Sequence, residues 1–166
     1  MNKLRARTIA AVTLLGISGS STADDAFLYD ANLKGITICV DDSDVSVDIP
    51  KPGIASASWI ESQIKVQVML RLFTNNVRFK QEKLCIHNAL RLFLQTTDGE
   101  TGGNRGFIVK LRLVDYNATG YKIVDTWSST RFGWTDFTSG ELETTMVDIA
   151  RTTLEDLTRA WVKANP

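Results

Sequence analysis

Residues 107–115, Phe-Ile-Val-Lys-Leu-Arg-Leu-Val-Asp, form the central strand of the predicted fold. Its side chains alternate with a period of two, the pattern of a strand with one face on a core. Similar segments occupy residues 89–96 and 121–131, and Asn-Ala-Thr-Gly at residues 117–120 is typical of a hairpin turn. We therefore predict an antiparallel meander of three strands with one buried face.

The chain before this meander predicts two shorter strands and several loops. Ile36, Ile38 and Val40 alternate within residues 35–41, which favours an N-terminal strand. Residues 41–53 are rich in Asp and predict a loop, and residues 77–80 predict a short strand. The glycine-rich residues 99–106 predict a turn between two strands of the meander.

Two helices complete the predicted domain. Residues 58–75 fit either a strand or a helix, because their apolar side chains both alternate and recur at i, i+4 spacing. We choose the helix, since Ser58 and Glu61 form a capping box and a strand of this length is unusual. A second helix begins near Thr138 and carries one apolar stripe, formed by Leu142, Met146, Ile149, Ala150, Thr153, Leu154, Leu157 and Trp161.

This order of elements predicts an α+β, two-layer domain. A mostly antiparallel sheet, the meander plus the N-terminal strand, should carry two helices packed on one face. The length of 166 residues fits one domain, which we expect to span residues 24–166.

Residues 1–23 have the parts of a cleavable secretory signal. A basic segment ends at Arg7, an apolar run covers residues 8–17, and small residues at 18–23 precede Asp24. The apolar run is too short to span a bilayer, although an attached amphipathic helix is the alternative. We expect an exported protein, periplasmic or extracellular, with no transmembrane segment in the mature chain.

The charge of the mature chain argues against nucleic acid as a partner. The signal holds three of the 19 basic residues, so 16 basic residues face 19 acidic ones in the remainder, a net charge of −3. A weakly acidic protein has no field that attracts a polyanion.

The chain has two cysteines, Cys39 and Cys85. In an exported protein an even pair predicts a disulfide, with two separate buried thiols as the alternative. Two cysteines and one histidine, widely spaced, do not make a metal ligand set, so we expect no metal and no cofactor.

Several short motifs occur along the chain in a recognisable order. They are residues 33–38 (Leu-Lys-Gly-Ile-Thr-Ile), 68–72, 77–79, 126–128 (Thr-Trp-Ser), 132–133, 157–161 and 164–166. With these motifs the chain resembles a group of small, secreted, uncharacterised bacterial proteins. Its order of elements is also similar, more distantly, to the N-terminal domain of TolB and to curli-secretion lipoproteins. Both resemblances imply the fold and bring no catalytic residue.

The sequence has few groups of residues that could catalyse a reaction together. His87 is the single histidine, and its closeness to Cys85 allows a thiol-dependent hydrolase or redox protein as an alternative function. The acidic run at residues 41–48 lacks the Gly and Glu positions of an EF-hand, which favours a solvated loop.

Aromatic residues near the end of the meander are the best functional candidates. We expect Trp127 in the core, and Phe132, Trp134 and Phe137, with Arg131, in a connection between strand and helix. Large aromatic side chains outside the core are typical anchors for a partner. The sequence therefore predicts a non-catalytic module that binds a protein or envelope component, with a loop folded back onto the core as the alternative.

Overall fold

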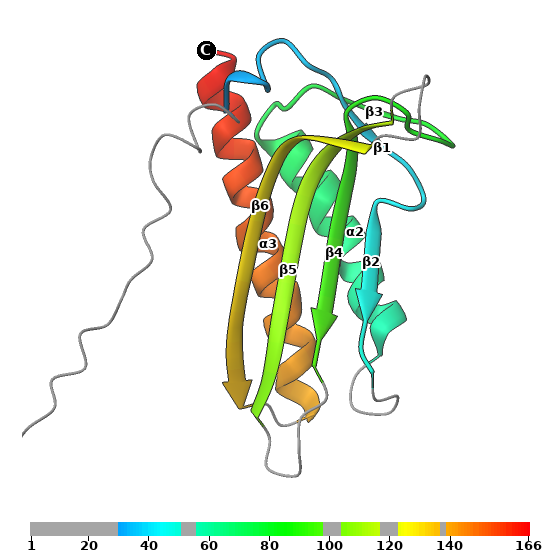
Figure 1. The fold of residues 1–166 in the computed structure, drawn as a ribbon, viewed down its shortest axis with the longest axis vertical. Helices are drawn as coiled ribbons and strands as arrows, with labels where there is room; N and C mark the ends of the chain where they lie inside the picture. Colours follow the sequence, from blue (N-terminus) through cyan, green and yellow to red (C-terminus); the bar gives the residue numbers. More distant parts are fainter. Residues whose placement is uncertain (1–29, 51–55, 98–103, 117–122, 137–138) are drawn as a thin grey trace, which may run out of the picture.

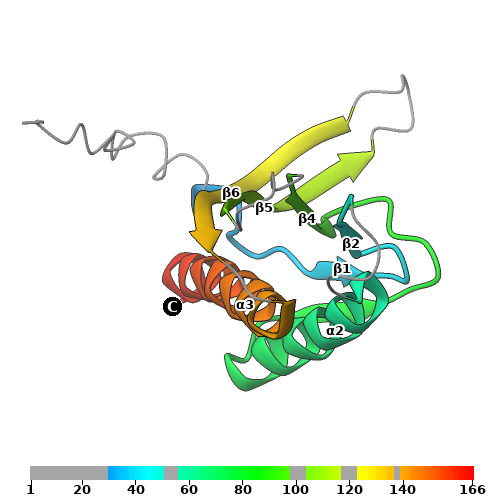
Figure 2. The same cartoon turned by 90° about the horizontal axis from the view of Figure 1, so that it is seen from below.

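The computed structural model describes residues 30–50, 56–97, 104–116, 123–136 and 139–166 (Figure 1). A six-stranded sheet forms one layer and two helices form the other, so the predicted α+β, two-layer architecture is confirmed. Figure 2 shows both helices on the same side of the sheet, so no helix of the described residues covers its opposite side. The predicted signal at residues 1–23 lies outside the described residues.

The meander is formed by β4 (Ala89–Thr96), β5 (Asn104–Tyr116) and β6 (Ile123–Asp136). These three strands pair with one another antiparallel, with Leu92 opposite Leu111 and Leu113 opposite Trp127. The side chains facing the helices are buried, among them Val109, Leu111 and Trp127, as the alternation predicted. The predicted hairpin turn at residues 117–120 lies outside the described residues.

Two boundaries of the meander differ from the sequence prediction. β5 already begins at Asn104, inside the predicted glycine-rich turn. β6 continues to Asp136, so Phe132 and Trp134 belong to a strand and not to a connection. The physical reason is pairing, because residues 104–108 lie opposite residues 132–136 and extend the ladder at both ends.

Three short strands join the meander in parallel and make the sheet mixed. β1 (Ile38–Val40) pairs with β3 (Phe79–Gln81) and, through Cys39 and Ala89 alone, with β4. β2 (Val45–Asp48) pairs with β4 over four residues. The prediction of an unbroken loop at residues 41–53 was therefore wrong, because Val45 and Val47 alternate with polar residues and complete the ladder.

Helix α2 (Ala57–Thr74) confirms the choice of helix over strand. Its buried side chains are the i, i+4 stripe of Ile60, Ile64, Val68 and Leu72. The N-cap differs from the prediction, since the side chain of Ser56, not Ser58, accepts from the backbone N–H of Trp59. 

Helix α3 (Ser139–Ala164) lies beside α2 and covers the meander (Figures 1 and 2). Leu142, Met146, Leu154 and Leu157 are fully buried, which confirms the predicted stripe. In the described part of the chain, neither helix is apolar enough over a sufficient length to cross a membrane.

Candidate functional site

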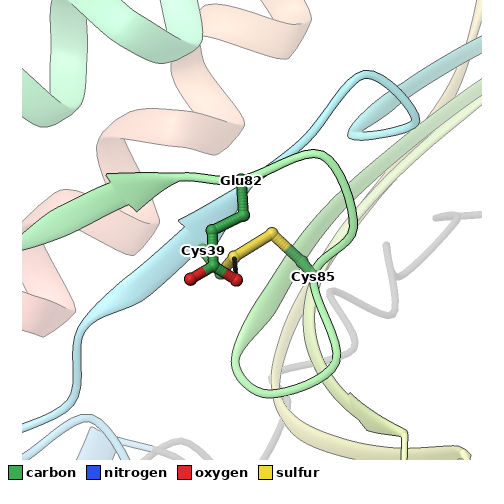
Figure 3. A group of neighbouring side chains, drawn as sticks. All are labelled: Cys39, Glu82 and Cys85. Carbon is green, nitrogen blue, oxygen red and sulfur yellow. Dashed lines mark hydrogen bonds between the residues drawn. A yellow bond between two sulfur atoms is a disulfide. The ribbon is translucent and has the colours of Figure 1, made fainter.

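The two cysteines form a disulfide in the structure. Cys39 on β1 and Cys85 in the segment between β3 and β4 are joined at an Sγ–Sγ distance of 2.03 Å, and both are buried. Figure 3 shows the Glu82 carboxylate lying beside Cys39, and its Oε2 is 3.6 Å from the Cys39 Sγ. Glu82, Cys39 and Cys85 are close enough to share a metal ion, but both sulfur atoms are used in the disulfide.

The Cys85–His87 pair does not have the arrangement of a nucleophile and its base. Cys85 has no free thiol, because the two cysteines of the chain, Cys39 and Cys85, are bonded to each other. The side chain of His87 is largely exposed, with its Nδ1 3.7 Å from an Asp115 carboxylate oxygen. A thiol-dependent mechanism would require reduction of a buried disulfide before any chemistry.

Asp41 is the centre of a buried polar cluster next to the disulfide. Its carboxylate accepts bonds from both Nη atoms of Arg91 at 3.0 and 2.9 Å, from the N–H of Cys85 at 2.8 Å, and from Ser43. Arg91 also donates from Nε to the Tyr116 hydroxyl at 3.0 Å. Burial raises the pKa of Asp41, but these hydrogen bonds outweigh it and lower the pKa to about 2.

A small cavity lies beside this cluster, and we name it the acidic cavity. Its volume is about 150 Å³, and its lining residues are Val40, Asp41, Asp42, Asp44, Lys65, Gln81 and Glu82. Asp44 is only 3% exposed, and its Oδ1 has no hydrogen-bond partner among the described residues. Burial raises the pKa of Asp44 to about 6, against the opposing charge of Lys65.

The open side of the sheet carries an apolar cluster, which we name the aromatic patch. It consists of Phe93, Ile108, Phe132 and Trp134, on β4, β5 and β6. Phe132 lies directly opposite Ile108, while Phe132 and Trp134 are 82% and 78% exposed. The side chains at alternate positions on the same strands, such as Val109, are buried under the helices, so the patch faces away from them.

A glycine supports the position of Trp134. Gly106 lies opposite Trp134, and a Cβ built on Gly106 would come within 3.3 Å of the indole Cζ3 atom. The indole therefore lies against the bare backbone of β5 and remains open to solvent on its other side. An aromatic ring held in this way loses little freedom when a partner covers it.

Arg131, another predicted contact residue, lies away from this patch. The Arg131 guanidinium bonds to the Asp156 carboxylate of α3 at 2.6 Å, on the helix side of the sheet. Phe137 lies outside the described residues. Trp127 is buried in the core, as predicted.

Sequence reasoning missed the acidic cavity. The acidic run was interpreted as a solvated loop, whereas Asp41 and Asp44 are buried. The burial depends on Arg91 and Lys65, which are far away in the chain, so no local pattern indicates it. The exposed aromatic residues, by contrast, were identified from residue type alone.

No family model and no curated protein matches the chain. Among solved structures, this chain is similar to a variant PelC dodecamer from Paraburkholderia phytofirmans, with 16% sequence identity and a TM-score of 0.38. The match covers 72% of this chain and 89% of the PelC chain. A minor lipoprotein from Acinetobacter baumannii matches with 10% identity and a TM-score of 0.29, over 69% of this chain and 91% of the lipoprotein chain. With identities and TM-scores this low, the likeness supports no inference about function, and the resemblance to small secreted bacterial proteins stays a prediction.

Proposed function

We propose that this chain is an exported, non-catalytic binding module, and that the aromatic patch is its contact surface for a protein or another component of the cell envelope. The observation that carries the proposal is the exposure of Phe132 and Trp134 on the side of the sheet opposite α2 and α3, which no helix in the described part of the chain covers. Buried aromatic anchors dominate the binding energy of many interfaces, which makes two exposed aromatic neighbours a favourable centre for one.

Two further features support an exported location for this function. The sequence begins with the features of a secretory signal, and Cys39 and Cys85 are paired in the structure. Disulfides persist in oxidising compartments such as the periplasm and are rare in the cytosol. An extracytoplasmic protein would meet envelope components as its natural partners.

The test compares the binding of three purified proteins to envelope fractions and to the periplasmic proteins of the exporting host. They are the wild-type chain, the double variant Phe132→Ala/Trp134→Ala, and the control Phe73→Ala. Phe73 is an aromatic residue on α2 that is 74% exposed, so the control removes similar apolar area from another surface. The bound component is identified by mass spectrometry, purified, and titrated against all three proteins.

We expect the double variant to bind at least about tenfold more weakly, because each anchor contributes on the order of 1–2 kcal/mol to a typical interface. The Phe73→Ala control should bind like the wild type, and all three should have similar thermal midpoints. Equal binding by the three proteins would show that the patch is not the contact surface. If no envelope component binds the wild type, the proposed function itself fails.

A further inference from the structure

Helix α2 carries a second apolar stripe on the face turned away from the sheet. Helix positions i, i+7, i+11 and i+14 lie within about 60° of one another, because a helix has 3.6 residues per turn. In α2 these positions are occupied by large apolar side chains that are 43–74% exposed, Trp59, Val66, Leu70 and Phe73. They lie opposite the buried stripe of the same helix, in the outermost layer of the molecule in Figure 2. We name them the outer stripe.

The outer stripe is surrounded by uncharged residues. The charged residues of α2 are Glu61, Lys65 and Arg71, and their spacing places all three on the inner half of the helix. Lys65 bonds to Glu61 at 2.9 Å and to the Asp42 carbonyl at 3.0 Å, and Arg71 bonds to Glu155 of α3 at 2.9 Å. The polar residues nearest the outer stripe are Ser62, Gln63, Gln67 and Thr74.

This absence of charge on the outer half of α2 narrows the choice of partner. A helix that lies on a membrane surface has basic side chains on its polar face, whereas Lys65 and Arg71 are engaged with acidic residues of the same molecule. A charged partner would find no complementary group on the outer half of α2. A second copy of the same face, by contrast, brings apolar residues against apolar residues without juxtaposing like charges.

The order of residues in the outer stripe is self-complementary. Trp59 lies seven residues before Val66, and Phe73 lies seven residues after it. A twofold axis through Val66, perpendicular to α2, therefore places Trp59 of each copy against Phe73 of the other. In the same register Leu70 faces Ser62, so a large side chain meets a small one. Antiparallel helices that cross at about 20° stay in contact over several turns, which allows all these pairs to form together.

The area of the outer stripe suits a weak dimer. A large apolar side chain presents about 150–250 Å² when fully exposed, so the outer stripe offers on the order of 400 Å² of apolar surface. Two such faces with their polar surroundings would bury about 1,000 Å² in total, near the lower limit of a specific interface. An interface of this size corresponds to a Kd on the order of 10–100 µM.

We propose that the outer stripe of α2 is a self-association surface, on which two copies of this chain pair antiparallel about a twofold axis at Val66. The aromatic patch lies on the opposite side of the sheet, so such a dimer would present two patches to the outside. The dimer does not depend on the function proposed above. At concentrations well below its Kd the chain is monomeric, so Phe73→Ala keeps its meaning as a control for the patch.

The experiment is sedimentation velocity of the chain purified from an exporting host, over concentrations on both sides of the expected Kd. Val66→Glu and Val66→Lys each place two like charges against each other on the twofold axis, whereas an equimolar mixture of the two variants places opposite charges there. Val124→Glu makes the same change at a valine of similar exposure on β6, away from α2. Binding of each protein to phosphatidylcholine vesicles is measured in parallel.

We expect the wild type and Val124→Glu to dimerise alike, and each Val66 variant alone to associate at least about tenfold more weakly, because like charges would meet at the interface. The mixture should recover dimers. A wild type that stays monomeric, or a Val66→Glu variant that dimerises like it, would overturn the proposal. Loss of dimers in both Val66 variants without recovery in the mixture would refute the axis at Val66. Monomers that bind vesicles through Val66 would assign the outer stripe to a membrane instead.

Discussion

At the scale of single residues, the ion pair of Asp41 and Arg91 makes a specific prediction about pH. The pKa of Asp41 is lowered to about 2 from its ordinary value of 3.8. A carboxyl group with a lowered pKa stabilises the folded state above pH 3.8, and this contribution is lost as the pH falls through about 2. We expect Asp41→Asn to lower the free energy of unfolding by about 2–4 kcal/mol at neutral pH, since it also leaves Arg91 buried without its counter-charge.

The measurement is urea unfolding of the wild type and Asp41→Asn across the acidic range, in the presence of a chelator. The difference in stability between them should be constant above about pH 5 and should shrink towards pH 2. Asp42→Asn is the matched control, because Asp42 is the exposed neighbour of Asp41 and should cost little at any pH. A difference that does not change with pH would mean that Asp41 acts through its shape and not through its charge.

Individual side chains also mark the limit of prediction from the sequence. Phe132 and Trp134 were recognised as candidates because large aromatic residues are distinctive wherever they occur. Asp41 and Asp44 look like members of a solvated acidic run, and their burial depends on partners from other elements. The partner of Asp41 is 50 residues away in the chain, and periodicity carries no information about such pairs.

At the scale of elements, the ladder of β5 and β6 depends on a contact between Gly133 and Phe107. They lie opposite each other, and a Cβ on Gly133 would come within 2.8 Å of the Phe107 Cζ atom. Because this contact is far too short, we expect Gly133→Ala to destabilise the protein by about 1–3 kcal/mol. In the double variant Gly133→Ala/Phe107→Ala the clash is absent, so the cost of adding the methyl group should largely disappear.

A double-mutant cycle measured by urea unfolding gives the coupling energy of these two positions. We expect a coupling energy of more than about 0.5 kcal/mol, with the double variant more stable than the sum of the two single changes predicts. Additive costs would indicate that the backbone of β6 moves away from the ring and that the glycine has no packing role.

The elements were predictable in proportion to their length and regularity. Helix α3 and the meander carry many repeats of one period, and their inner faces were identified correctly. Strand β2 has four residues, too few for a period to stand out from a loop rich in Asp. The continuation of β6 to Asp136 was missed because its last residues are held by pairing with β5, a non-local interaction.

At the scale of the whole molecule, the sheet consists of two unequal parts. The larger part is the meander, which has long antiparallel ladders and is covered by α3. The pair β1 and β3 meets β4 through one residue pair, Cys39 and Ala89. The connection between these parts is reinforced by the disulfide and by the ion pair of Asp41 and Arg91.

This arrangement predicts that loss of the disulfide affects one part first. Closing a loop with a sequence separation of 46 stabilises a chain by about 4 kcal/mol in the chain-entropy model. We expect Cys39→Ala/Cys85→Ala to lose up to that amount in urea unfolding. Amide hydrogen exchange should accelerate most in β1 and β3, because local opening requires less free energy where the ladders are short. In β4, β5 and α3 the free energy of opening should stay close to the free energy of global unfolding. Uniform acceleration over all strands would instead show that the sheet opens as one cooperative unit, with the disulfide stabilising the whole molecule equally.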